Sequence, residues 1–130
     1  IKRNSAATCW GIYKRNFLTE GLSFSYNLND IITYYSLYQN LMSFWQNQYA
    51  ERIYNLNYEM LTTNQEGEIK KLIQHLELSW QEECLAPQNN KRRVTTASSS
   101  QIRKKIYKDS SREWEKFKPF LNDIFDNFDD

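Results

Sequence analysis

Residues 28–48 read LNDIITYYSLYQNLMSFWQNQ, and this stretch decides the fold of the chain. Its apolar positions recur mostly at spacings of three and four residues, the period of one helix face; they are Leu28, Ile31, Ile32, Tyr35, Tyr38, Met42 and Trp45. Asn27 and Asn29 are candidate N-caps, and Asp30 falls in the first turn, where negative charge is favourable. We predict a long amphipathic helix whose aromatic stripe packs in the core; stacking on a ligand is the less frequent alternative.

Upstream of this helix, a second helix is predicted over residues 6–17, with Ser5 as its N-cap. Gly21 interrupts the pattern between the two helices. Downstream, residues 52–58 alternate apolar and polar side chains and contain β-branched and aromatic types, so they are predicted to form a strand.

The second half of the chain is also predicted to be helical. Residues 62–64 end the strand and cap a helix whose buried face is Ile69, Leu72, Ile73 and Leu76. Residues 80–85 form a short helix that Pro87 stops, and residues 88–100 form a loop. Ser110 and Ser111 are predicted to cap a last helix. One full strand cannot make a complete sheet, so the chain is predicted to be mostly α with a minor β component.

The composition fits a single folded domain of 130 residues, with 40% apolar residues and a net charge of +1. A net charge near zero argues against a protein that coats nucleic acids. The sequence contains no run of 18 apolar residues, so no membrane-spanning helix is predicted. Cys9 and Cys84 have no partner at metal-ligand spacing and favour a reducing, cytoplasmic compartment, with no metal cofactor. His75 could act as a general base, but a structural histidine is the more frequent outcome.

A local anion-binding segment stands out against this neutral background. Residues 91–105 read KRRVTTASSSQIRKK, with cations at both ends, hydroxyl groups between them and no acid. Basic groups, hydroxyls and backbone N–H donors together bind phosphate or sulfate, although a solvated basic loop is the commoner role for such a segment.

Several motifs occur in an order that resembles the carboxy-terminal half of the sulfotransferase family. They are residues 2–13 (KRNSAATCWGIY), 24–30 (FSYNLND), 58–62 (YEMLT), 90–98 (NKRRVTTAS), 101–103 (QIR) and Trp114. The resemblance is to the bacterial and marine tetratricopeptide-linked enzymes and, more distantly, to protein-tyrosine sulfotransferases. It implies the carboxy-terminal part of a P-loop-like α/β fold with an incomplete sheet, residues 1–130 being one partial domain.

The resemblance also implies transfer of a sulfuryl group from 3′-phosphoadenylyl sulfate (PAPS) to a hydroxyl or amine. Arg3, Gly11 and Arg15 would hold the 3′-phosphate of PAPS or of its product, adenosine 3′,5′-bisphosphate. Arg15, at i+4 from position 11, would share its helix face. The remaining cofactor-binding residues implied are Tyr58, Ser98, Ser99, Ser100, Gln101, Ile102 and Arg103.

The residues support part of this assignment independently. Arg3 precedes a predicted helix N-terminus, where backbone N–H groups and the helix dipole attract an anion, and its guanidinium is a fork for phosphate oxygens. The family has Ser at position 11 and Pro at position 5, whereas this chain has Gly11 and Ser5. Losing one hydroxyl donor to a charged group costs roughly 1.5–3 kcal/mol.

The family's phosphosulfate-binding loop and its catalytic base lie in the amino-terminal half, so no catalytic residue is expected among these 130 residues. We therefore expect a sulfotransferase fragment with little or no activity alone, completed by an amino-terminal half. The alternative is a non-enzymatic helical interaction module, whose exposed sheet edge and apolar face would pair with another copy or another chain. A nucleic-acid binder ranks last, because residues 91–105 lack interleaved stacking aromatics. No membrane partner is expected, and the acceptor is not readable from the sequence.

Overall fold

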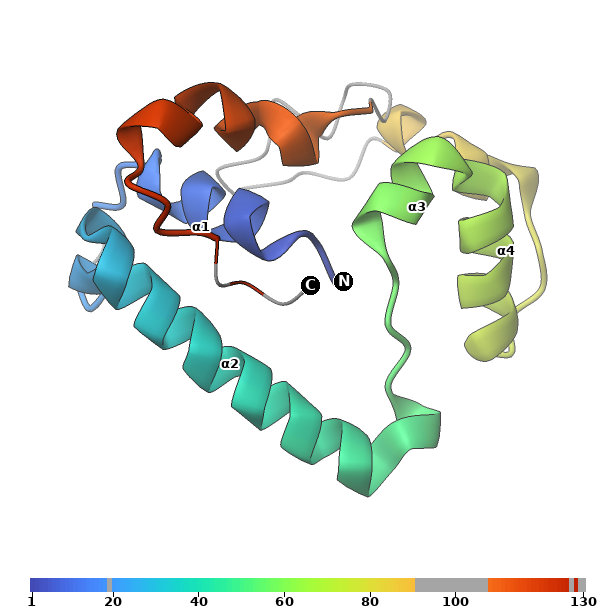
Figure 1. Cartoon of the computed structure of the whole chain (residues 1–130). Coiled ribbons are helices and arrows are strands. Elements are labelled where there is room, and N and C mark those ends of the chain that lie inside the picture. The colour runs from blue at the N-terminus through green and yellow to red at the C-terminus, as the bar shows by residue number, and fades with distance from the viewer. Residues whose placement is uncertain (19, 91–107, 127, 129–130) are drawn as a thin grey trace. The chain divides into compact units, whose positions relative to one another are not determined.

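The computed structural model describes residues 1–18, 20–90, 108–126 and 128, and its elements are helices (Figure 1). This confirms the mostly α prediction. The chain divides into two compact units: one combines Lys2–Asn55 with Asp109–Asp130, and the other comprises Ile1 and Leu56–Lys108. Each unit is described separately below.

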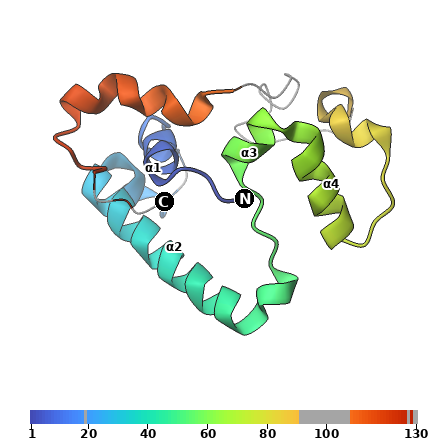
Figure 2. The same cartoon turned by 45° about the vertical axis from the view of Figure 1, so that its right-hand side comes forward.

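The first unit joins the two ends of the chain around α1. It contains α1 (Ser5–Tyr13), η1 (Ser23–Tyr26), α2 (Leu28–Tyr49), η2 (Ala50–Arg52) and η5 (Ser110–Phe120), where η denotes a 3₁₀ helix. Helix α1 packs against both η5 and α2, as Figures 1 and 2 show. The buried core consists of Ala6, Cys9, Ile31, Tyr35, Leu121 and Phe125. The Trp114 and Phe125 rings add an edge-to-face contact to it.

Helix α2 matches the prediction closely. Its N-cap is Asn27, whose side chain accepts hydrogen bonds from the backbone N–H groups of Asn29 and Asp30. Ile31 and Tyr35 are its buried residues, so the aromatic stripe contributes to the core as expected. The helix ends one residue beyond the predicted limit, at Tyr49.

Helix α1 differs from the prediction at both ends. Its N-cap is Asn4, whose side-chain oxygen accepts from the N–H of Ala7 at 2.9 Å. The prediction that Ser5 caps the helix was wrong: Ser5 is buried and its hydroxyl donates to the Tyr35 hydroxyl at 3.1 Å. The helix ends at Tyr13 rather than Phe17, because Lys14 forms its C-cap.

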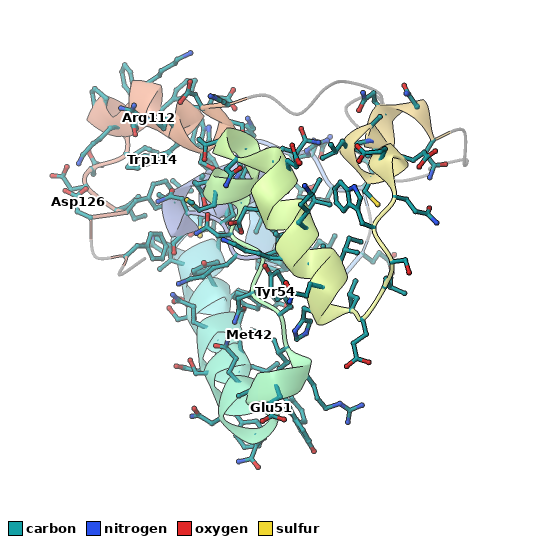
Figure 3. The ribbon with its side chains drawn as sticks, turned by 90° about the vertical axis from the view of Figure 1, so that its right-hand side faces the viewer. Met42, Glu51, Tyr54, Arg112, Trp114 and Asp126 are labelled. Atoms are coloured by element: carbon teal, nitrogen blue, oxygen red, sulfur yellow. The ribbon has the colours of Figure 1, made fainter. Side chains whose placement is uncertain are left out.

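The C-terminal segment also starts differently from the prediction. Asp109, in a left-handed conformation at φ 67°, precedes η5 and makes no side-chain cap. Ser110 and Ser111 were wrongly predicted as caps, since both lie within the first turn of η5. Arg112, Trp114 and Asp126 on this segment are labelled in Figure 3. Arg112 pairs with Glu115, and Lys118 pairs with Asp126 at 2.9 Å across the end of η5.

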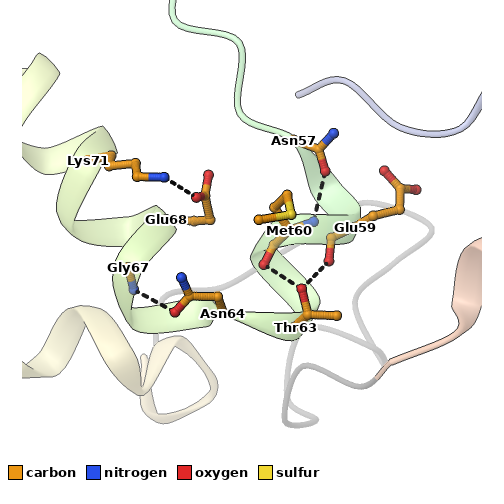
Figure 4. Close-up of polar contacts among 8 residues, drawn as sticks. All are labelled: Asn57, Glu59, Met60, Thr63, Asn64, Gly67, Glu68 and Lys71. Atoms are coloured by element: carbon orange, nitrogen blue, oxygen red, sulfur yellow. Dashed lines mark hydrogen bonds and ion pairs between the residues drawn. The ribbon is translucent and has the colours of Figure 1, made fainter.

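The second unit is a small helical assembly. It contains α3 (Tyr58–Thr63), α4 (Gln65–His75), η3 (Glu82–Leu85) and η4 (Pro87–Asn89). Asparagines cap both α-helices: Asn57 accepts from the N–H of Met60 and Asn64 from that of Gly67 (Figure 4). The cap at Asn64 confirms the predicted start of α4, whereas the sequence analysis missed α3.

The predicted strand at residues 52–58 was wrong. Arg52 ends η2 and Tyr58 begins α3, with no regular element between them. A strand needs a paired neighbour to satisfy its backbone groups, and the described ranges contain no β-strand element to pair with. Asn57 instead caps a helix, and β structure in the part of the chain described is limited to the isolated bridge positions Lys2 and Asn57.

The apolar face of α4 is less buried than predicted. Ile69, Leu72 and Ile73 are half-buried, but Leu76 is exposed. The buried residue of this helix is Glu68, whose carboxylate pairs with Lys71 Nζ at 2.7 Å (Figure 4). The predicted short helix at residues 80–85 is the 3₁₀ turn η3, and Pro87 begins η4 beyond it.

Candidate anion-binding site at helix α1

Arg3 lies one residue before the N-cap of α1 and is half-buried. Its Nε donates to Ser111 Oγ at 3.1 Å, and its Nη2 donates to the Ser110 carbonyl oxygen at 2.9 Å. Two of the five guanidinium N–H donors therefore fix the plane of the group against the first turn of η5. This arrangement holds a bidentate cation beside the positive end of a nine-residue helix, the setting that favours a phosphate.

Positive charge extends beyond Arg3. Lys14 Nζ donates to the carboxylate of Glu113, and this hydrogen bond holds the pKa of Glu113 below its ordinary value. Lys116 and Arg3 lower that pKa further through Coulomb attraction. Glu113 therefore lies among three cations, Lys14, Lys116 and Arg3, and its carboxylate balances part of their charge.

Gly11 lies on α1, eight residues after Arg3. A Cβ atom built at this position meets no heavy atom within 4 Å. The position consequently has room for the serine that the sequence resemblance leads one to expect, and its glycine is not required by packing.

Arg15 lies beyond the end of α1. Its N–H donates to the carbonyl of Ile12 at 3.0 Å, a bond three residues back, after the C-cap at Lys14. The prediction that Arg15 shares a helix face with position 11 through regular i+4 spacing was therefore wrong, because the helix ends at Tyr13. Its role in binding the 3′-phosphate stays a prediction.

The contacts of Arg3 and α1 do not test the other predicted cofactor residues. Tyr58 is the half-buried first residue of α3, in the second unit, and its contact with the nucleotide stays a prediction. Ser98, Ser99, Ser100, Gln101, Ile102 and Arg103 lie outside the described residues. The structure therefore brings together Arg3 and α1 with Gly11, but it does not test the cofactor contacts predicted for Tyr58 and residues 98–103.

Ser110 and Ser111 are site-positioning residues that the sequence analysis missed. Their separation of more than 100 positions from Arg3 hid the contact. In the sequence, Ser110 and Ser111 are a pair of small hydroxyl residues before an aromatic run. That pattern equally predicts a helix cap, so it did not indicate a contact with Arg3.

Across residues 1–18, 20–90, 108–126 and 128, no three His, Cys, Asp or Glu side chains come together as a metal site requires. In those same ranges, no helix has the length and apolarity needed to cross a bilayer.

Comparison with known proteins identifies the class. The sequence model of the sulfotransferase family matches residues 1–82, which include Arg3, all of α1 and Tyr58. The chain belongs to the sulfotransferase family. It is 30% identical over 128 residues to an uncharacterized protein of Aquifex aeolicus (strain VF5). That alignment covers 97% of this chain but 17% of the relative, so the chain spans about a sixth of that protein's length. No solved structure matches it.

Proposed function

We propose that this chain forms the 3′-phosphate-binding part of the PAPS site of a sulfotransferase. The observation that carries the proposal is the guanidinium of Arg3, fixed by Ser110 and Ser111 beside the N-terminus of α1. Family membership supplies the reaction class, sulfuryl transfer. Lys14 and Lys116 add cations to the same region, although Glu113 pairs with Lys14.

In this proposal, residues of the chain bind and orient the nucleotide, and they do not perform the proton transfer. Arg3 donates paired hydrogen bonds from its guanidinium to the 3′-phosphate, and the dipole of α1 attracts the phosphate charge. Tyr58, Arg15 and residues 98–103 complete the nucleotide contacts. Sulfuryl transfer also needs a base for the acceptor proton and cationic donors at the leaving phosphate. An amino-terminal part of a P-loop-like α/β fold would supply both.

A cytoplasmic location belongs to the same proposal. Cys9 is buried and Cys84 is half-buried, and both are free thiols, which suits a reducing compartment.

The direct test is calorimetric titration of the chain with adenosine 3′,5′-bisphosphate. We expect saturable binding, with an affinity that falls at least about tenfold in Arg3→Ala, the loss of one charge-assisted contact. Absence of heat at millimolar nucleotide would remove the proposal.

A second function, self-association, is favoured by the outer face of α2. Tyr34, Leu37, Leu41 and Phe44 follow each other at spacings of three, four and three residues, and each is more than half exposed. The helix carries no charge after Asp30, so two copies would meet without like-charge repulsion. Light scattering tests this candidate: a monomer at every concentration contradicts it.

A further inference from the structure

The first unit has a surface cavity of about 470 Å³, lined by the last residue of α1, the end of η1, the start of α2 and the end of η5 with the residues that follow it. Its size falls within the range of about 300–1,000 Å³ that small-ligand sites occupy. Among the described residues that line it, none carries a charge, although a quarter of the chain's residues are charged. A neutral lining disfavours the phosphates and carboxylates that bind through ion pairs.

Aromatic rings form one part of the lining. Phe120 is 80% exposed, and Tyr13 and Tyr26 present further rings at 39% and 55% exposure. The Tyr26 hydroxyl donates to the Asn16 side chain at 3.0 Å, which anchors that ring. Exposed rings of this kind offer flat apolar surfaces against which the C–H face of a sugar ring can pack.

Asparagine amides form the other part. Asn29 and Asn122 line the cavity, and their side chains make no hydrogen bond to the part of the chain that is described. Each amide carries both a donor group and an acceptor. A hydroxyl group is also both donor and acceptor, so neighbouring hydroxyls on one ligand match an amide better than an apolar ligand does.

The combination of neutral charge, exposed rings and amides without a hydrogen bond to the described residues points to one ligand class. We propose that this cavity binds a neutral carbohydrate and is the acceptor subsite of the enzyme, the acceptor group being a sugar hydroxyl. The role of the cavity as an acceptor subsite rests on the proposed sulfotransferase function. Carbohydrate binding by the cavity itself rests on the lining residues alone.

The test is titration of the full 130-residue chain with lactose, a neutral disaccharide. Saturation-transfer NMR measures the binding. We expect saturable binding in the millimolar range. Phe120→Ala removes the exposed ring, and Asn122→Gly removes the amide while tolerating the backbone φ of 46° at that position. Each should weaken lactose binding about tenfold, the factor expected for one good contact. Tyr49→Ala, which removes an exposed ring from the end of α2 outside the cavity, should leave the affinity unchanged.

Several results would overturn the inference: no saturable lactose binding, equal affinity in Phe120→Ala and the unmodified chain, or displacement of lactose by phenol or glucuronate at lower concentration. Titration with adenosine 3′,5′-bisphosphate on the same samples separates the two proposals. Bisphosphate binding without lactose binding removes the carbohydrate subsite and leaves the proposed function intact. Lactose binding without bisphosphate binding supports the cavity as a sugar site and removes its acceptor role.

Discussion

The guanidinium of Arg3 donates to the hydroxyl of Ser111 at 3.1 Å, although 108 positions separate the two residues in sequence. This bond ties the start of the chain to its C-terminal segment beside the N-terminus of α1. Ser111 is buried and Arg3 is half-buried, so the bond is partly shielded from water and holds the guanidinium in one plane. The proposed phosphate site therefore depends on a residue outside the stretch that the family's sequence model matches.

Substituting Ser111 with Ala should destabilise the fold and weaken nucleotide binding together. Loss of a hydrogen bond to a charged donor costs roughly 1.5–3 kcal/mol. Urea unfolding measures the stability change, and calorimetry with adenosine 3′,5′-bisphosphate measures the affinity. Ser110→Ala is the matched control, because Ser110 contacts Arg3 through its backbone carbonyl. Equal effects of the two substitutions would argue against the role given to the Ser111 hydroxyl.

Substituting Gly11 with Ser should raise both helix stability and nucleotide affinity. Position 11 has room for a side chain, and Ser is a better helix former than Gly by roughly 0.5 kcal/mol. A new hydroxyl donor to a phosphate should strengthen bisphosphate binding by about tenfold. Gly11→Ala separates the effects, since it stabilises the helix but adds no donor. If Ala and Ser raise the affinity equally, the hydroxyl is not involved.

Unlike Gly11, Gly67 should gain little or no stability from substitution with Ala. A Cβ at position 67 would lie 2.5 Å from Asn64 Nδ2, so Gly67→Ala displaces the side chain that caps α4. The helix gain of about 0.5–1 kcal/mol is then offset by a cap loss of about 1 kcal/mol. In an Asn64→Ala background, the same change should stabilise α4 by the full helix gain. A double-mutant cycle by thermal unfolding measures this coupling, and additive effects would contradict it.

Burial of Cys9 should make stability depend on alkaline pH. Desolvation raises the pKa of its thiol from 9.0 to about 12. Below pH 9 the thiol is protonated in the folded and unfolded chain alike. Above it, the unfolded chain loses the proton first, so the free energy of unfolding falls as pH rises from 9 towards 12. Urea unfolding of the natural chain and of Cys9→Ala, at pH 8 and above pH 10, isolates this contribution. The same pH dependence in both chains would contradict it.

Local signals in the sequence were sufficient to predict α2. Asn27, Asp30 and the apolar spacing act within one element, and burial of Ile31 and Tyr35 agrees with them. The cap of α1 was harder to predict, because Asn4 and Ser5 are both good N-caps and are adjacent. The choice is made by Tyr35, 30 positions away, whose hydroxyl accepts from Ser5.

The strand prediction failed for a physical reason of the same kind. The alternation of apolar and polar side chains at residues 52–58 is typical of a strand. A strand also needs a neighbouring strand to hydrogen-bond with, and the periodicity of one segment does not reveal whether such a neighbour exists. The contact between Arg3 and Ser111 was equally invisible, since nothing local to either residue marks the other. Arg3 and Gly11 were proposed as site residues through resemblance; only their placement near α1 is visible in the structure.

The central claim is that Arg3 and α1 recognise a 3′-phosphate, and one calorimetric comparison tests it most directly. The chain is titrated with adenosine 3′,5′-bisphosphate and with adenosine 5′-monophosphate, which lacks the 3′-phosphate, and both titrations are repeated with Arg3→Ala. We predict that the natural chain binds the bisphosphate at least about tenfold more tightly, and that this preference disappears in Arg3→Ala. Equal affinity for the two nucleotides in the natural chain, or a preference that survives the loss of Arg3, would contradict the account.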